Sequence, residues 1–84
     1  MVELSELDWI VQKTAELLAD KVRDAPLTDQ DVEMAFDAFA RSRLEHLSDS
    51  FKSKQERTQA RDFIIMKLRE RTKQLNAEHW GKEE

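Results

Sequence analysis

Apolar residues recur at helical spacing in three segments of this chain, and each segment opens with the same start signal. The signal is a hydroxyl side chain followed three residues later by an acid, as in a helix capping box. It occurs at Ser5, Thr28 and Ser53. Behind each start, large apolar side chains fall at i, i+3, i+4 and i+7. The sequence therefore predicts three helices, over about 6–23, 29–47 and 54–79.

Different residues mark the ends of these helices. Pro26 disfavours helix through Ala25, and Gly81 is placed to form a left-handed cap. About four residues join the first two helices, which predicts antiparallel neighbours. The apolar pattern pauses over residues 48–53, where serine and aspartate favour a turn. One bent helix through this pause is the alternative.

Composition limits the class of protein. The chain has 84 residues with one Gly, one Pro and no Cys, which excludes a disulfide scaffold and a thiolate zinc site. No run of about 18 apolar residues exists to span a membrane, and the acidic start is unlike a signal peptide. We expect one soluble all-α domain over residues 1–84, located in the cytoplasm.

The predicted architecture is a three-helix bundle whose last helix is too long for its partners. That helix would measure roughly 39 Å against roughly 27 to 30 Å for the others, so residues around Leu75, His79 and Trp80 should overhang by about two turns. The core of such a small domain is thin, and burial against a partner would help it. The expected core residues are Leu7, Ile10, Val11, Leu17, Leu18, Val22, Val32, Phe36, Phe39, Leu44, Leu47, Ile64, Ile65, Leu68 and Leu75.

The last predicted helix is apolar on more than one side. Ile64, Leu68 and Leu75 form one stripe, whereas Phe63 and Met66 point well away from it. Two companion helices cannot bury a third on all sides. Either Phe63 and Met66 are half-covered by their neighbours, or this helix carries a second interface, with another copy or a foreign protein.

Charge is segregated along the chain. Residues 1–40 carry three basic and ten acidic side chains, and residues 41–73 carry ten basic and five acidic ones. The plain interpretation is pairing between the two halves, within or between subunits. The acidic half could instead imitate nucleic acid or dock on a basic protein.

The basic residues also allow a nucleic-acid interpretation, because they could contact phosphates. Against it, the pI is 5.2 and the aromatic residues do not interleave with the basic ones as stacking platforms would. The residues concerned are Lys52, Lys54, Arg57, Arg61, Lys67 and Arg71, with Arg69 and Lys73 beside them.

Residues suited to catalysis are few. His46 with Asp49 supplies two metal ligands at most, and a histidine near a helix C-terminus is explained by the helix dipole. One glycine excludes a glycine-rich phosphate loop. A chain this short builds a substrate pocket with difficulty. We expect no enzymatic activity, no cofactor, no metal and no small-molecule substrate.

The function predicted from the sequence is therefore non-catalytic: a small regulatory or adaptor protein that binds another protein and associates with itself through the last helix, forming a homo-oligomer. Nucleic-acid association is the alternative. Trp9 could be a hydrophobic staple with Leu4 or an exposed anchor, and the same choice applies to Trp80. The predicted partner-binding residues are Phe63, Met66, Leu75, Trp80, Arg69, Lys73 and Trp9.

Overall fold

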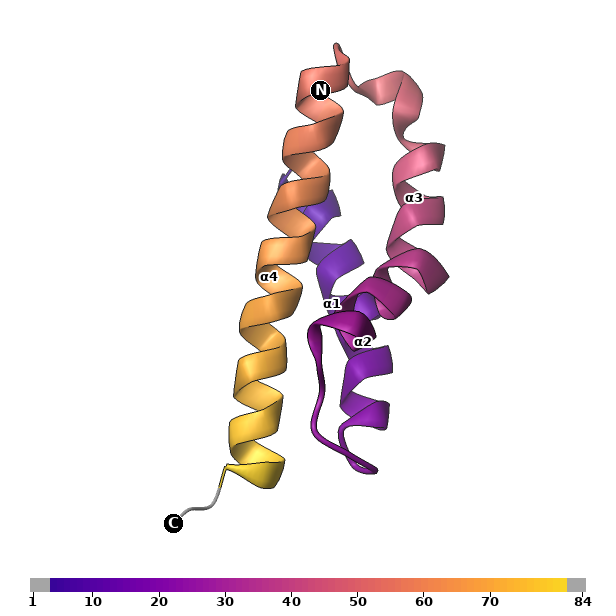
Figure 1. Ribbon diagram of the computed structural model, residues 1–84. Helices are drawn as coiled ribbons and strands as arrows, with labels where there is room; N and C mark the ends of the chain where they lie inside the picture. The colour runs from indigo at the N-terminus through magenta and orange to yellow at the C-terminus, as the bar shows by residue number, and fades with distance from the viewer. Residues whose placement is uncertain (1–3, 82–84) are drawn as a thin grey trace.

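The computed structural model describes residues 4–81, and every regular element within that range is helical. Three long stretches of helix run up and down beside one another (Figure 1). This confirms the all-helical class and the three helices expected from the sequence. The elements are α1 (Leu4–Lys21), α2 (Asp29–Ala35), the π-helical turn η1 (Phe36–Ala40), α3 (Arg41–His46), the 3-10 turn η2 (Ser48–Ser50) and α4 (Lys54–Trp80).

Two of the three predicted helix starts have the expected chemistry. At Thr28, the Oγ1 atom accepts a hydrogen bond from the N–H of Asp31 at 3.3 Å, and the Asp31 carboxylate accepts from the N–H of Thr28 at 2.9 Å. At Ser53, the Oγ atom accepts from the N–H of Glu56 at 3.2 Å, while the Glu56 carboxylate accepts from the N–H of Lys52. Since η2 and the extended Ser53 separate α3 from α4, the single bent helix is wrong.

The predicted start at Ser5 is wrong. α1 already includes Leu4, so Ser5 lies in its first turn, and Leu4 cannot precede the cap as a hydrophobic staple requires. An acid three residues after a hydroxyl also arises on the polar face of an ordinary helix. In a chain with 18 acidic residues, the spacing alone is therefore weak support for a cap.

Asp31, the acid of the Thr28 capping box, also connects α1 to α2. Lys21 at the end of α1 forms an ion pair with Asp31. The lysine and the Thr28 N–H both stabilise the carboxylate, and they lower the pKa of Asp31 below its ordinary value of 3.8. A carboxyl with a lowered pKa in the folded state contributes stability above its unfolded pKa and loses that contribution as the pH falls.

We therefore expect the replacement Asp31→Asn to destabilise the protein at neutral pH more than in acid. Urea unfolding of both proteins at a series of pH values measures the difference. The gap in free energy of unfolding should narrow as the pH falls through about 4. A gap that widened on acidification would show that the carboxylate does not stabilise the fold.

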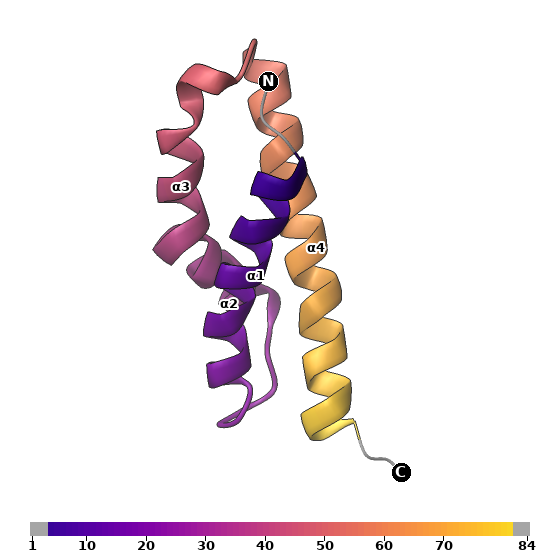
Figure 2. The ribbon, with the colours of Figure 1, turned by 180° about the vertical axis from the view of Figure 1, so that it is seen from behind.

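The hydrophobic core lies where α1 packs against α4 and against the α2–η1–α3 run. α1 lies across the gap between those two, on one side of the molecule (Figure 2). The most deeply buried large side chains are Ile10, Leu18, Val22, Val32, Ile64 and Leu68. Leu17, which we expected in the core, is 44% exposed. It lies on the flank of the buried stripe of α1, which includes Ile10, Thr14 and Leu18.

The π-helical turn η1 was not expected from the sequence. The backbone N–H of Arg41 donates to the carbonyl of Phe36, five residues earlier. Four buried residues of this run are four apart, at Val32, Phe36, Ala40 and Leu44, and Ala35 is buried beside them. On a regular α-helix, the direction of the side chain turns by about 40° around the helix axis at each step of four residues. The wider turn takes up part of that rotation, so all four side chains face the core.

The far end of α4 does not overhang, which corrects the prediction. The Asn76 side chain accepts a hydrogen bond from the Leu27 N–H at 2.7 Å and donates one to the Leu27 carbonyl at 3.0 Å. The Trp80 indole N–H donates to the Val22 carbonyl at 2.6 Å, and Leu75 packs against the core. The last turns of α4 are thus held against the connection between α1 and α2.

Gly81 ends α4 without the left-handed conformation that we expected, since its φ is −83°. Its N–H donates to the carbonyl of Ala77 at 3.2 Å. A Cβ atom on Gly81 would lie 2.7 Å from both the Cα and the carbonyl oxygen of Ala77. Glycine is needed here for this close approach of the backbone, rather than for a positive φ.

Candidate functional site

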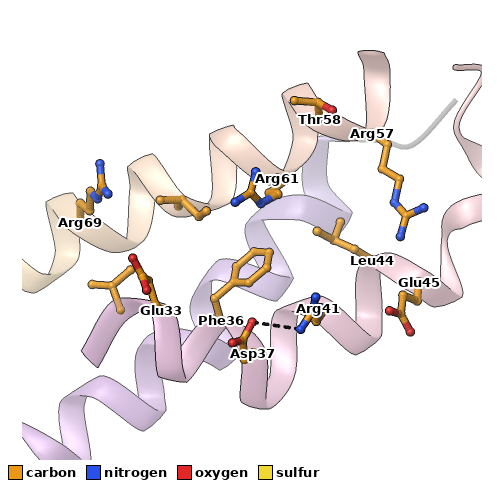
Figure 3. A pocket seen from close by; sticks show the side chains of 12 residues that line it. Glu33, Phe36, Asp37, Arg41, Leu44, Glu45, Arg57, Thr58, Arg61 and Arg69 are labelled. Carbon is orange, nitrogen blue, oxygen red and sulfur yellow. Dashed lines mark ion pairs between the residues drawn. The ribbon is translucent and has the colours of Figure 1, made fainter. Parts of the chain in front are cut away.

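A groove of about 580 Å³ runs between α4 and the α2–η1–α3 run, on the side of the molecule away from α1 (Figure 3). Its floor is apolar. Val32, Phe36 and Leu44 rise from one helix and Ile65 from the other. The first three are buried, and Ile65 is half-buried. The groove exists because α2 packs against α4, whereas α3 stands apart from α4 before the chain returns to it through η2 (Figure 1).

The two walls of this groove carry opposite charges. The α4 wall presents Arg57, Arg61 and Arg69. The α2–α3 wall presents Glu33 and Glu45, with Asp37 and Arg41 between them as an ion pair at 3.7 Å. Within residues 4–81, no ion pair joins one wall to the other. The three arginines of α4 and the two glutamates that line the groove are all exposed and available to other charges.

A second, shallower hollow of about 340 Å³ lies on the outer face of α4, and we call it the outer patch. Its apolar lining residues are Ile65 and Met66, and Met66 is 47% exposed. Asp62, Glu70 and Lys73 surround Met66. The outer patch and the groove share Ile65 and Arg69. The two hollows therefore form one continuous surface along α4.

Three of the predicted partner-binding residues lie together in the outer patch: Met66, Arg69 and Lys73. Three other predicted residues, Phe63, Leu75 and Trp80, already make contacts within the fold. Phe63 packs partly against the core with the Lys67 ammonium 5.7 Å from its ring centroid. Leu75 is half-buried, and Trp80 is hydrogen-bonded to Val22 although its side chain is 47% exposed.

Trp9 lies apart from the outer patch. Its ring packs against Phe39 with centroids 5.7 Å apart, and the Arg43 guanidinium lies 4.9 Å from its centroid. Together with His46 and Leu47 it borders a small hollow of about 230 Å³ between α1 and α3. The residue is 41% exposed and its ring contacts Phe39 and Arg43, so the packing of α1 against η1 and α3 already accounts for it.

The residues proposed for nucleic-acid contact do not form one row. Arg57 and Arg61 line the groove, opposite acidic side chains. Lys67 forms an ion pair with Glu70 at 3.8 Å, and Arg71 contacts Gln74 at 3.5 Å. Neither lines the groove. Lys52 precedes α4 and Lys54 is its first residue.

The expected pairing of the acidic and basic halves is wrong within the subunit. The ion pairs of residues 4–81 join neighbours along a helix, except for Lys21–Asp31, which lies inside the acidic half. Only Arg41–Asp37 crosses from one half to the other, and it does so over four residues. The reason is geometric. The groove separates the α4 arginines from the acids of α2 and α3.

The described residues offer little for chemistry. Between residues 4 and 81, no three His, Asp or Glu side chains converge as metal ligands. His46 is exposed, and its Nδ1 atom lies 2.9 Å from the Ser42 carbonyl. No helix in the same part of the chain is long and apolar enough to cross a bilayer.

Sequence reasoning missed the acidic wall and the apolar floor of the groove. Phe36 and Leu44 were expected in the core and are buried there, but their position on the floor of a groove was not predicted, and neither was the position of Glu45 in its wall. The exposed Met34 on α2, at 55%, was also overlooked. A helical wheel of one segment cannot reveal a groove whose walls come from two segments. The chain matches no protein-family model, and no curated protein or solved structure is similar to it.

Proposed function

We propose that this protein is a non-catalytic interaction protein, which binds another protein through the surface formed by the groove and the outer patch. The observation that carries the proposal is the position of Met66. It lies on α4 diametrically opposite the stripe of Ile64 and Leu68, both of which are fully buried. Through Ile65 it is continuous with the apolar floor of the groove, and a contiguous apolar surface with a polar border is typical of a binding surface.

The basic residues around this surface support the same proposal. Arg69 and Lys73 border Met66 and form no ion pair with any residue of the described range. Arginine at the border of an apolar patch is common in protein interfaces, because its guanidinium stacks and makes several hydrogen bonds at once. Nucleic acid is a weaker candidate, since Glu33, Asp37 and Glu45 would repel phosphates in the groove.

A photo-crosslinking amino acid at position 66 tests this proposal. With the full chain expressed in its own cells, we expect discrete protein adducts from position 66, identified by mass spectrometry. The matched control carries the same crosslinker at Gln12, which is exposed on α1. Adducts that are no stronger from position 66 than from position 12 would contradict a binding role for this surface.

The substitution Met66→Glu gives the complementary result. It changes an exposed side chain, so the fold should persist with a change in stability of only about 0.5 kcal/mol. A charge at the centre of the patch should nevertheless weaken partner binding by at least about tenfold, equal to about 1.4 kcal/mol. Binding that is unchanged in a folded Met66→Glu variant would place the interface elsewhere.

A further inference from the structure

We infer that the partner at this surface is a second copy of the same chain, docked groove to groove about a two-fold axis that runs parallel to the groove. This inference rests on the proposed function and names its partner. The juxtaposition behind it is an arginine wall and a glutamate wall on either side of one apolar floor, with no ion pair between the walls within residues 4–81.

At each end of the groove, an arginine of one wall lies opposite a glutamate of the other. Figure 3 shows Arg57 opposite Glu45 at one end of the groove and Arg69 opposite Glu33 at the other. Arg61 lies between them, at the level of the Asp37–Arg41 pair. Arg57 and Arg69 therefore each have an unpaired negative charge at the same level on the other wall, while Arg61 faces an ion pair.

Symmetry decides how two such faces can meet. Rotation by 180° about an axis parallel to the groove brings α4 of each copy onto the α2–α3 wall of the other, without shifting the levels. Arg57 then meets the partner's Glu45, and Arg69 meets the partner's Glu33. Rotation about an axis across the groove would instead set α4 against α4, with arginine facing arginine. The first arrangement is favourable and the second is repulsive.

The same rotation also accounts for the exposed methionines. Met34 and Met66 lie outside the groove, next in sequence to its lining residues Glu33 and Ile65, and they are 55% and 47% exposed. Because the rotation sets α4 of one copy beside α2 of the other, it brings Met34 of one copy to the same side of the interface as Met66 of the other. Each subunit contributes both residues, as a two-fold interface requires.

Charge reversal with cross-rescue tests the inference. One variant is acidic on both walls and carries Arg57→Glu, Arg61→Glu and Arg69→Glu. The other is basic on both walls and carries Glu33→Arg and Glu45→Arg. All five side chains are exposed, so circular dichroism should show intact helices. Analytical ultracentrifugation over a dilution series then measures the dimerisation constant of the parent, of each variant and of their mixture.

We expect the parent to dimerise and each variant alone to have a dimerisation constant weaker by at least about a hundredfold, because like charges then face each other. An equimolar mixture of the two variants should form a heterodimer, in which every wall again meets its opposite. Added salt should weaken both the parent dimer and the heterodimer. A control with Arg23→Glu, Lys54→Glu and Arg71→Glu has the same change in charge outside the groove and should dimerise like the parent.

A parent that stays monomeric would overturn the inference, and so would variants that dimerise normally or a mixture that does not associate. Should a multiple variant fail to fold, the single pair Arg57→Glu and Glu45→Arg applies the same test. A monomeric parent that still yields crosslinks to a foreign protein from position 66 would overturn the inference and leave the proposed function standing. Binding of a monomer to duplex DNA, lost in the acidic variant, would overturn both.

Discussion

Replacing Leu68 by alanine is expected to lower the free energy of unfolding by about 3 to 5 kcal/mol. Leu68 is fully buried near the middle of α4, in the stripe that also contains Ile64 and Ala60. The loss combines the apolar surface that is no longer buried with the cavity left behind. A protein of this length has a total stability of only about 4 to 13 kcal/mol, so urea should unfold the variant at a much lower concentration.

The matched control is Met66→Ala, on the same helix half a turn away. Its side chain is 47% exposed, so we expect a loss of at most about 1 kcal/mol. Urea unfolding followed by circular dichroism measures both variants. Equal losses at the two positions would mean that α4 does not present Leu68 to the core and Met66 to the outside.

The second large effect is expected at Asn76. Its side chain makes two hydrogen bonds to the backbone of Leu27, at 2.7 and 3.0 Å, and both are partly buried. Asn76→Ala would leave a donor and an acceptor of Leu27 without these partners. We expect it to lower the free energy of unfolding by about 2 kcal/mol, since each unpaired and partly buried backbone group costs about 1 kcal/mol or more.

Amide hydrogen exchange gives a local measure of the same change. The Leu27 N–H should exchange faster in Asn76→Ala, while amides in the middle of α4 change only as much as global stability does. Gln74→Ala is the control, because Gln74 is exposed and contacts only Arg71, at 3.5 Å. If Leu27 were as well protected in Asn76→Ala as in the parent, the hydrogen bonds to Asn76 would not hold the α1–α2 connection.

Local chemistry explains what the sequence predicted well. The caps at Thr28 and Ser53 depend on residues three apart, and both form. The turn between α3 and α4 follows from a cluster of serine and aspartate, whose side chains compete with helix. Helical periodicity alone placed Ile10, Leu18, Ile64 and Leu68 in the core, where they are buried.

Contacts between distant segments explain what the sequence did not predict. The overhang of α4 was inferred from helix length alone. Helix length cannot reveal that Asn76 bonds to Leu27, which lies 49 residues away in the sequence. The π turn could not be foreseen, because side chains four apart are compatible with an ordinary α-helix. The outer patch was partly anticipated from Met66, Arg69 and Lys73. The groove beside it was not, because its acidic wall comes from α2 and α3.

The two attachments at the end of α4 also constrain the order of events when the chain is made. Val22 and Leu27 receive their partners from Trp80 and Asn76, 58 and 49 residues further along the chain. The first two helices can meet early, as near neighbours in sequence do, and the Lys21–Asp31 ion pair joins them. The hydrogen bonds to Val22 and Leu27, in contrast, form only after residues 76–80 have been added to the chain. The connection between α1 and α2 is therefore better protected from proteases once the last turns of α4 have folded against it.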